Sequence, residues 1–148
     1  MNLEHLPEGL AHLLLDTHVL LWLMLGEDRL GPVARQRIQA ASQVDSLLIS
    51  SITPWEIGVL TSKKRIDLHR DTMAWVREAL SMPGVTLVPL NPEIAVASTR
   101  LPFEMHPDPA DRIIVASVRQ TGATLVTADR ALLALAEAGN FRAMDAEQ

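Results

Sequence analysis

The chain has 148 residues, of which 48% are hydrophobic and 21% charged, and its formal net charge at pH 7 is -5. This length and composition predict one soluble globular domain spanning residues 1–148 and exclude an extended disordered chain. The acidic balance argues against a broad basic face for nucleic acid, although carboxylates that hold a metal ion would themselves lower the net charge.

Membrane and export segments are not expected. No apolar run approaches the ~20 residues that a membrane-spanning helix needs, because Asp16 and His18 interrupt the longest candidate. Residues 1–11 contain acids and lack an apolar segment followed by a cleavage site, so we expect a short N-terminal extension and no signal peptide. The chain has no cysteine, which excludes disulfides and cysteine-based zinc sites. A cytoplasmic location is therefore expected.

Short apolar runs alternate with longer helical segments along the whole chain. The expected strands are residues 12–15, 47–50, 85–88, 123–127 and 141–144, and the expected helices are residues 17–25, 32–41, 53–62, 71–81, 91–100, 108–120 and 129–138. Strand and helix alternate, which predicts an α/β fold with a parallel sheet and right-handed crossovers.

Two of the expected helices carry start signals in their sequence. Thr53 is expected at the N-cap of the third helix, followed by a proline and by Glu56 at the third position of a capping box. Asp108 precedes Pro109 and is expected to cap the helix that begins there. On that helix, a rotation of ~100° per residue directs Arg112 to solvent and places Asp111 on the flank, level with the sheet edge.

Four acidic residues stand where ligands bind in a parallel sheet. Asp16 follows the first strand, Glu56 the second and Asp129 the fourth, while Asp111 lies in the first turn of the helix that feeds the fourth strand. Ligands of open parallel sheets bind beyond the carboxyl ends of the strands, so these acids are expected to converge. Clustered carboxylates repel one another, and a hard divalent ion such as Mg²⁺ or Mn²⁺ relieves that repulsion. Such an ion suits phosphate chemistry.

Each acid also has a purely structural interpretation. Aspartate is a preferred helix N-cap, which applies to Asp16, Asp108 and Asp129, and an acid in the first helical turn is favoured by the helix dipole. The alternative to a metal site is therefore a set of helix caps on a folded module that only binds partners. The four acids all stand where strand ends meet at one edge of the sheet, and this shared position favours the metal site.

Four segments of the chain, in order, resemble the motifs of PIN-domain proteins, and most closely those of VapC-type toxins of bacterial toxin–antitoxin pairs. These segments are LLLDTHVLLW at 13–22, SITPWEI at 51–57, HPDPADRIIVA at 106–116 and LVTAD at 125–129. The resemblance covers residues 12 to about 145. It implies a three-layer α/β sandwich with a five-stranded parallel sheet.

The resemblance also implies a function and a set of site residues. The function would be Mg²⁺-dependent hydrolysis of RNA phosphodiester bonds, with Mn²⁺ able to substitute, by a homodimer that a cognate antitoxin neutralises. Matched motif by motif, the metal-binding and catalytic quartet falls on Asp16, Glu56, Asp111 and Asp129, and Thr127 matches a hydroxyl that orders the site. Ala110 and Leu60 depart from residues common in relatives, which leaves substrate contacts and local packing less defined.

Other features of the sequence support weaker hypotheses. Lys63, Lys64 and Arg65 form a basic run that would either contact an RNA backbone or simply complement a helix C-terminus. His18, with His12 or His106, would suit zinc, but the surrounding acids favour a harder ion. The tryptophans, at 22, 55 and 75, could stack on bases, although Trp22 and Trp55 have the apolar neighbours of a core or interface.

One rival enzyme class uses an aspartate as a nucleophile toward phosphate. In aspartyl-phosphate phosphatases or phosphotransfer domains Asp16 would be phosphorylated. The phosphatases carry a second aspartate two residues later, where this chain has His18. A response-regulator receiver places its acceptor aspartate after the third strand, where this chain has Pro89 and Leu90.

Overall fold

The computed structural model describes residues 12–148, and the expected N-terminal extension at 1–11 lies outside the described residues. The strands are β1 (Leu13–Leu15), β2 (Leu47–Ser50), β3 (Val85–Val88), β4 (Thr124–Thr127) and β5 (Arg142–Asp145). The helices are α1 (Thr17–Leu25), α2 (Pro32–Ser42), α3 (Ile52–Ser62), α4 (Thr72–Leu80), α5 (Pro92–Thr99), α6 (Pro109–Thr121) and α7 (Arg130–Glu137). Within the described residues, no helix is both long enough and apolar enough to cross a bilayer.

The five strands form one parallel sheet in the order β3-β2-β1-β4-β5, which confirms the predicted fold class. The central strand is β1, and its Leu14 pairs with Leu48 on one side and with Leu125 on the other. The chain steps outward from β1 through β2 to β3 and then returns to build β4 beside β1. The strand order therefore reverses between β1 and β4, and a crevice is expected at their carboxyl ends.

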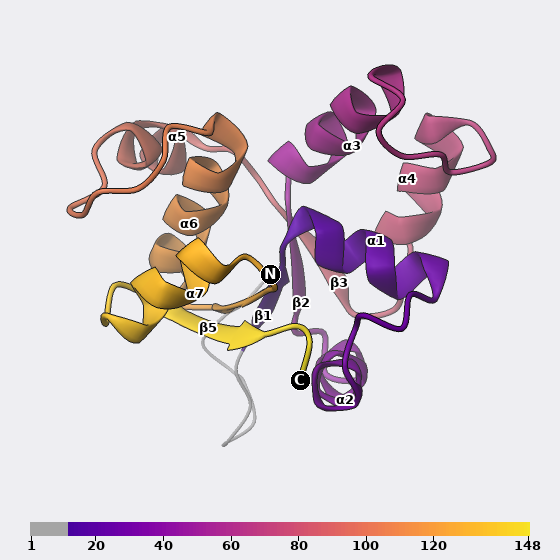
Figure 1. The fold of residues 1–148 in the computed structure, drawn as a ribbon, viewed down its shortest axis with the longest axis horizontal. Coiled ribbons are helices and arrows are strands. Elements are labelled where there is room, and N and C mark those ends of the chain that lie inside the picture. Colours follow the sequence, from indigo (N-terminus) through magenta and orange to yellow (C-terminus); the bar gives the residue numbers. More distant parts are fainter. Residues whose placement is uncertain (1–11) are drawn as a thin grey trace.

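Helices cover both faces of the sheet, so the fold has three layers (Figure 1). Side chains alternate across a strand, and Leu13 and Leu15 of β1 therefore join the apolar core under α1, α2, α3 and α4. Leu14 points the other way, into a second core with α5, α6 and α7. The central strand is buried on both faces, as its uninterrupted apolar sequence predicts.

The predicted start of the third helix is wrong. Helix α3 begins at Ile52 with Ser51 at its N-cap, and Ser51 makes no side-chain capping hydrogen bond. The Ile52 amide instead donates to the Ser50 hydroxyl at 3.1 Å, so the helix starts directly from the end of β2. Thr53 is fully buried and its hydroxyl lies 3.1 Å from that of Thr17. The Thr53 side chain, which the sequence pattern assigned to capping, therefore makes a tertiary contact instead.

The start of α6 agrees with the prediction at its cap. The Asp111 amide donates to the Asp108 carboxylate at 3.1 Å, which confirms Asp108 as the N-cap. The predicted solvent exposure of Arg112 is wrong. Its guanidinium donates to the carbonyl oxygens of Ser98 at 2.8 Å and Met105 at 3.3 Å, because the loop before α6 folds back over the helix.

Gly84 provides a test of how closely α2 approaches the start of β3. Its φ is +81°, and a Cβ placed there would lie 2.2 Å from the backbone oxygen of Ser42. Gly84→Ala should therefore lower the free energy of unfolding by more than the ~1–2 kcal/mol of left-handed backbone strain alone. Urea denaturation at constant pH measures the loss.

Gly122→Ala is the matched control, because Gly122 has φ +72° and a Cβ added there would meet nothing within 4 Å. This control should show the backbone strain without the clash. Equal losses for Gly84→Ala and Gly122→Ala would mean that the approach of α2 is readily relaxed.

Candidate functional site

The four acids predicted from the sequence gather at the carboxyl ends of β1 and β4. Asp16 caps α1 directly after β1, and Asp129 caps α7 two residues after β4. Glu56 comes from α3 and Asp111 from the first turn of α6. The negative charges of Asp16, Glu56 and Asp129 all act on Asp111, so the four acids form one electrostatic cluster.

Asp16 is the buried anchor of this cluster. Its side chain is almost fully buried, and its Oδ1 accepts a hydrogen bond from the Thr17 amide at 2.9 Å. Its Oδ2 accepts from the hydroxyl of Thr127 at 2.7 Å. The same hydroxyl accepts from the Asp129 amide at 3.0 Å. Thr127 therefore ties the end of β1 to the end of β4.

Glu56 is oriented by a residue that the sequence analysis did not single out. The Thr17 hydroxyl donates a short hydrogen bond to Glu56 Oε1. Burial raises the pKa of Glu56; the Thr17 hydrogen bond opposes this, and the charges of Asp16 and Asp108 add to it. The position of Thr17 next to Asp16 was the available signal, but its partner lies 39 residues away in the sequence.

Asp111 is the most perturbed acid of the cluster. Its side chain is 19% exposed. Burial, followed by the charges of Asp16, Asp108, Glu56 and Asp129, raises its pKa to about 7. A carboxyl group with four acidic neighbours gains most from a nearby cation.

Within residues 12–148, two sets of side chains offer donor atoms close enough together for a metal ion, and Asp111 belongs to both. The first set is Glu56, Asp108 and Asp111, and the second is His106, Asp111 and Asp129. In each set the donor atoms lie within 4.8 Å of one another. Opposite ligands of an octahedral Mg²⁺ ion are about 4.2 Å apart, so these residues fit a divalent ion after small shifts. The donor chemistry is thus that of a divalent-metal site.

The capping and site interpretations prove compatible. Asp129 Oδ1 accepts from the amides of Ala131 at 2.9 Å and Leu132 at 3.1 Å, yet its carboxylate also reaches Asp111. Asp108 caps α6 and also lies within reach of Glu56. Within residues 12–148, Asp16 belongs to neither metal-capable set, and its two oxygens accept hydrogen bonds from the Thr17 amide and the Thr127 hydroxyl.

The other sequence candidates lie around the cluster or away from it. The basic run, Lys63 to Arg65, is exposed at the end of α3, about 10 Å along the helix from Glu56 at 1.5 Å per residue. Trp55 is 57% exposed beside Glu56 and does not belong to the core, whereas Trp75 is buried. Within residues 12–148, neither metal-capable set includes His12 or His18.

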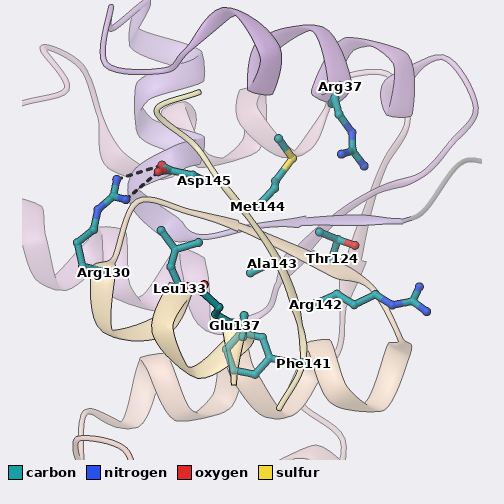
Figure 2. Close-up of a pocket in the computed structure, with 11 residues that line it drawn as sticks. Arg37, Thr124, Arg130, Leu133, Glu137, Phe141, Arg142, Ala143, Met144 and Asp145 are labelled. Atoms are coloured by element: carbon teal, nitrogen blue, oxygen red, sulfur yellow. Dashed lines mark hydrogen bonds and ion pairs between the residues drawn. The ribbon is translucent and has the colours of Figure 1, made fainter. Parts of the chain in front are cut away.

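A pocket outside the cluster follows the outer strand β5 (Figure 2). Its lining includes Arg37, Thr124 and Arg142, and contains none of the four acids. Arg142 and Thr124 pair at the amino ends of β5 and β4. The pocket therefore reaches the edge of the sheet opposite the acidic cluster.

The chain has a five-stranded parallel sheet and an acidic cluster at the point where the strand order reverses. These two features define its class of protein. The chain belongs to the PIN-domain family, since the model of the PIN domain matches residues 13–138. It is 34% identical over 119 residues to Ribonuclease VapC22 of Mycobacterium tuberculosis, a match covering 80% of this chain and 88% of that protein. The resemblance to VapC-type members is thereby confirmed.

Solved structures share the fold of this chain. The crystal structure of VapBC2 from Rickettsia felis bound to a DNA fragment of its promoter contains a chain with TM-score 0.64 and 13% identity, covering 90% of this chain and 97% of that one. DNA-bound VapBC from Salmonella typhimurium contains one with TM-score 0.61 and 16% identity, covering 93% and 99%. At such identities the similarity shows the fold.

The raised pKa of Asp111 predicts a pH dependence of stability without metal. In the folded chain its pKa is about 7, above its ordinary value of 3.8, so the folded state binds this proton more tightly. Stability should therefore fall as pH rises from about 4 to about 7 and then level off. Urea unfolding in EDTA across this range measures the slope.

Asp111→Asn is the matched variant, because it removes the titrating group and keeps the shape. The stability of this variant should decline less between pH 5 and pH 7.5 than that of the wild type. Excess Mg²⁺ added to the wild type should restore the stability that it loses by pH 7.5. Identical pH slopes for the two proteins would contradict the crowded environment of Asp111.

Proposed function

We propose that this protein is a Mg²⁺-dependent endoribonuclease that hydrolyses RNA phosphodiester bonds, with Mn²⁺ able to substitute. The observation that carries the proposal is the convergence of carboxylates on Asp111 in a chain of the PIN-domain family. The similarity to Ribonuclease VapC22 supports RNA as the substrate.

The proposed metal-binding and catalytic residues are Asp16, Glu56, Asp111 and Asp129. A divalent ion bound here would make water a stronger nucleophile and would neutralise charge on the phosphate oxygens. Asp111 holds its carboxylate at the point where both metal-capable sets meet. Thr17 orients Glu56, and Thr127 orients Asp16, whose oxygens each keep a second lone pair.

A cluster that only caps helices is less consistent with the geometry. Glu56 accepts from the Thr17 side chain, and the Asp111 carboxylate lies 3.3 Å from His106 Nε2, so neither carboxylate serves a helix N-terminus. Burial, together with the charges of neighbouring acids, raises the pKa of both, which costs folding free energy that helix caps alone would not require. Family membership likewise favours hydrolysis over transfer through a phosphorylated Asp16.

The proposed partner is a cognate antitoxin, in a toxin–antitoxin pair. The resemblance to VapC-type toxins carries this proposal, and the solved structures of VapBC assemblies with the same fold are consistent with it. A homodimer is also proposed, because α1 is apolar from Val19 to Leu25 and Leu25 at its end is 45% exposed. Burial of such side chains between two copies would remove apolar surface from water.

Removing the Asp111 charge is the main test of the function. Asp111→Asn should lower RNA cleavage by at least about 100-fold, the scale of loss when one preorganised electrostatic group is removed. The fold should be retained, because the substitution relieves repulsion in the absence of metal. Cleavage of a labelled RNA with Mg²⁺, and with EDTA as the metal-free control, measures the effect.

Asp108 supplies a matched comparison three residues away. Asp108→Asn keeps a good N-cap and should retain most activity, whereas Asp108→Ala should cost about 1 kcal/mol of stability. If Asp108→Asn is inactive and Asp111→Asn cleaves normally, the roles of the two aspartates are reversed.

The basic run is proposed to contact the RNA backbone. Neutralising Lys63, Lys64 and Arg65 should weaken binding and reduce the log–log salt slope by about 2–3 units. Cleavage at saturating RNA should change far less. RNA binding at several salt concentrations, with the catalytically inactive variant, gives the slope.

A control with the same change of charge uses Arg35, Arg37 and Arg142, which are exposed and line pockets at the amino edge of the sheet. Replacing these arginines by glutamine should leave the slope nearly unchanged. Equal effects of the two triple variants would indicate a response to net charge and not contact by the basic run.

A further inference from the structure

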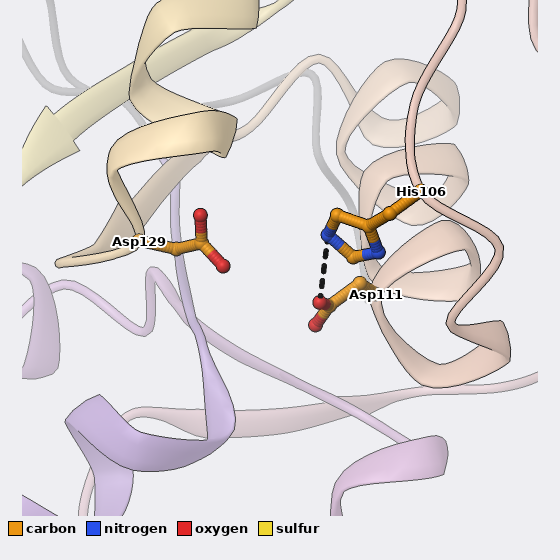
Figure 3. Close-up of side chains that lie close together, drawn as sticks. All are labelled: His106, Asp111 and Asp129. Atoms are coloured by element: carbon orange, nitrogen blue, oxygen red, sulfur yellow. Dashed lines mark ion pairs between the residues drawn. The ribbon is translucent and has the colours of Figure 1, made fainter.

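His106, which the sequence offered only as a partner of His18 in a disfavoured zinc site, lies beside the acidic cluster. The loop between α5 and α6 carries its imidazole over the first turn of α6, where Nε2 is 3.3 Å from Asp111 Oδ2. The carboxylate of Asp129 points into the same space from the start of α7 (Figure 3). An imidazole nitrogen and two carboxylates from three separate segments thus lie within 4.8 Å of one another.

The loop that carries His106 is held in place. The guanidinium of Arg112 donates to the carbonyl oxygen of Met105, the residue directly before His106. Phe103 and Met105 pack against the core under α6, and the Arg119 guanidinium lies 5.3 Å from the ring of Phe103. These contacts set the backbone from which the imidazole projects, so its place beside Asp111 follows from the fold.

His18 also lies beside the cluster, but its nitrogens are committed. Its Nε2 accepts a hydrogen bond from the Ala128 amide at 3.1 Å, so this atom carries no proton and its lone pair is used. The proton of the neutral ring is then on Nδ1, which faces Asp16 Oδ2 at 3.5 Å. His106, by contrast, directs one nitrogen at Asp111 and its side chain remains 37% exposed.

We propose that His106 is a nitrogen ligand of a divalent ion shared with Asp111 and Asp129, and that it makes this position prefer a first-row transition ion such as Mn²⁺ over Mg²⁺. The inference rests on the proposed function, because it assigns a further ligand to the same site. Mg²⁺ favours oxygen ligands, whereas imidazole adds affinity for first-row transition ions. On the other side of Asp111 the donors within reach are oxygens alone, as Mg²⁺ prefers; Glu56 would be the ligand there, while Asp108 caps α6.

Pulsed EPR of the full chain loaded with Mn²⁺ tests the ligand directly. Electron spin echo modulation from a coordinated ¹⁴N nucleus should appear in the wild type and disappear in His106→Gln. It should persist in His18→Gln, which removes the histidine whose nitrogens are already engaged. Labelling the wild type with ¹⁵N-histidine should shift the modulation frequencies, which tests histidine ligation without any substitution.

Calorimetric titration tests the preference between ions. The Mn²⁺ affinity of His106→Gln should fall at least about tenfold, the lower end of the loss seen when support of a metal site is removed. The Mg²⁺ affinity should change less, so the ratio of the two dissociation constants should move toward Mg²⁺.

The possible failures are distinguishable. Mn²⁺ binding and RNA cleavage without ¹⁴N modulation in the wild type would reject ligation by His106 and leave the proposed function intact. Modulation that persists in His106→Gln, or that is lost in His18→Gln alone, would also reject it. If neither ion binds the wild type, both the metal-dependent function and the ligation are wrong.

Discussion

Repulsion among carboxylates at the junction of β1 and β4 is the constraint around which this molecule is built. The reversal of strand order places Asp16, Asp129 and the first turn of α6 at one edge of the sheet, and burial then strengthens the repulsion. Burial first, and the charges of neighbouring acids after it, raise the pKa of Asp111 and of Glu56. Without a bound ion, the repulsion among the carboxylates opposes folding. Burial of the two apolar cores on the faces of the sheet must offset it.

Hydroxyl groups and backbone amides reduce that cost and fix the geometry of the site. Thr127 bridges Asp16 and the backbone of Asp129, and Thr17 donates to Glu56. Each bond favours one orientation of a carboxylate before any ligand arrives, which is the preorganisation that electrostatic catalysis uses. The N-termini of α1, α6 and α7 also point at the cluster, and their partial positive charge favours acids there. The arrangement that caps the helices is therefore also the one that the proposed metal site would use.

The cluster has two unequal sides that share Asp111. Toward α3, the donors around it are the oxygens of Glu56 and Asp108; toward α7, they are an oxygen of Asp129 and the nitrogen of His106. The loop before α6 creates this difference, because Arg112 holds it against the helix. A residue predicted to face solvent thus positions one side of the site.

The sequence alone determined the class of fold and the four acids, because both depend on local patterns. Apolar runs such as Leu13 to Leu15 read as buried strands, and the acids follow strand ends that a parallel sheet must bring to one edge. The tertiary structure decided what distant side chains do to one another. The sequence pattern predicts Thr53 as a helix cap, whereas in the folded protein Thr53 is a buried contact of Thr17. His106 reaches Asp111 only because the loop before α6 folds back over that helix. Hydrophobic periodicity reports which way a side chain faces, whereas its partner is chosen by packing between elements far apart in the chain.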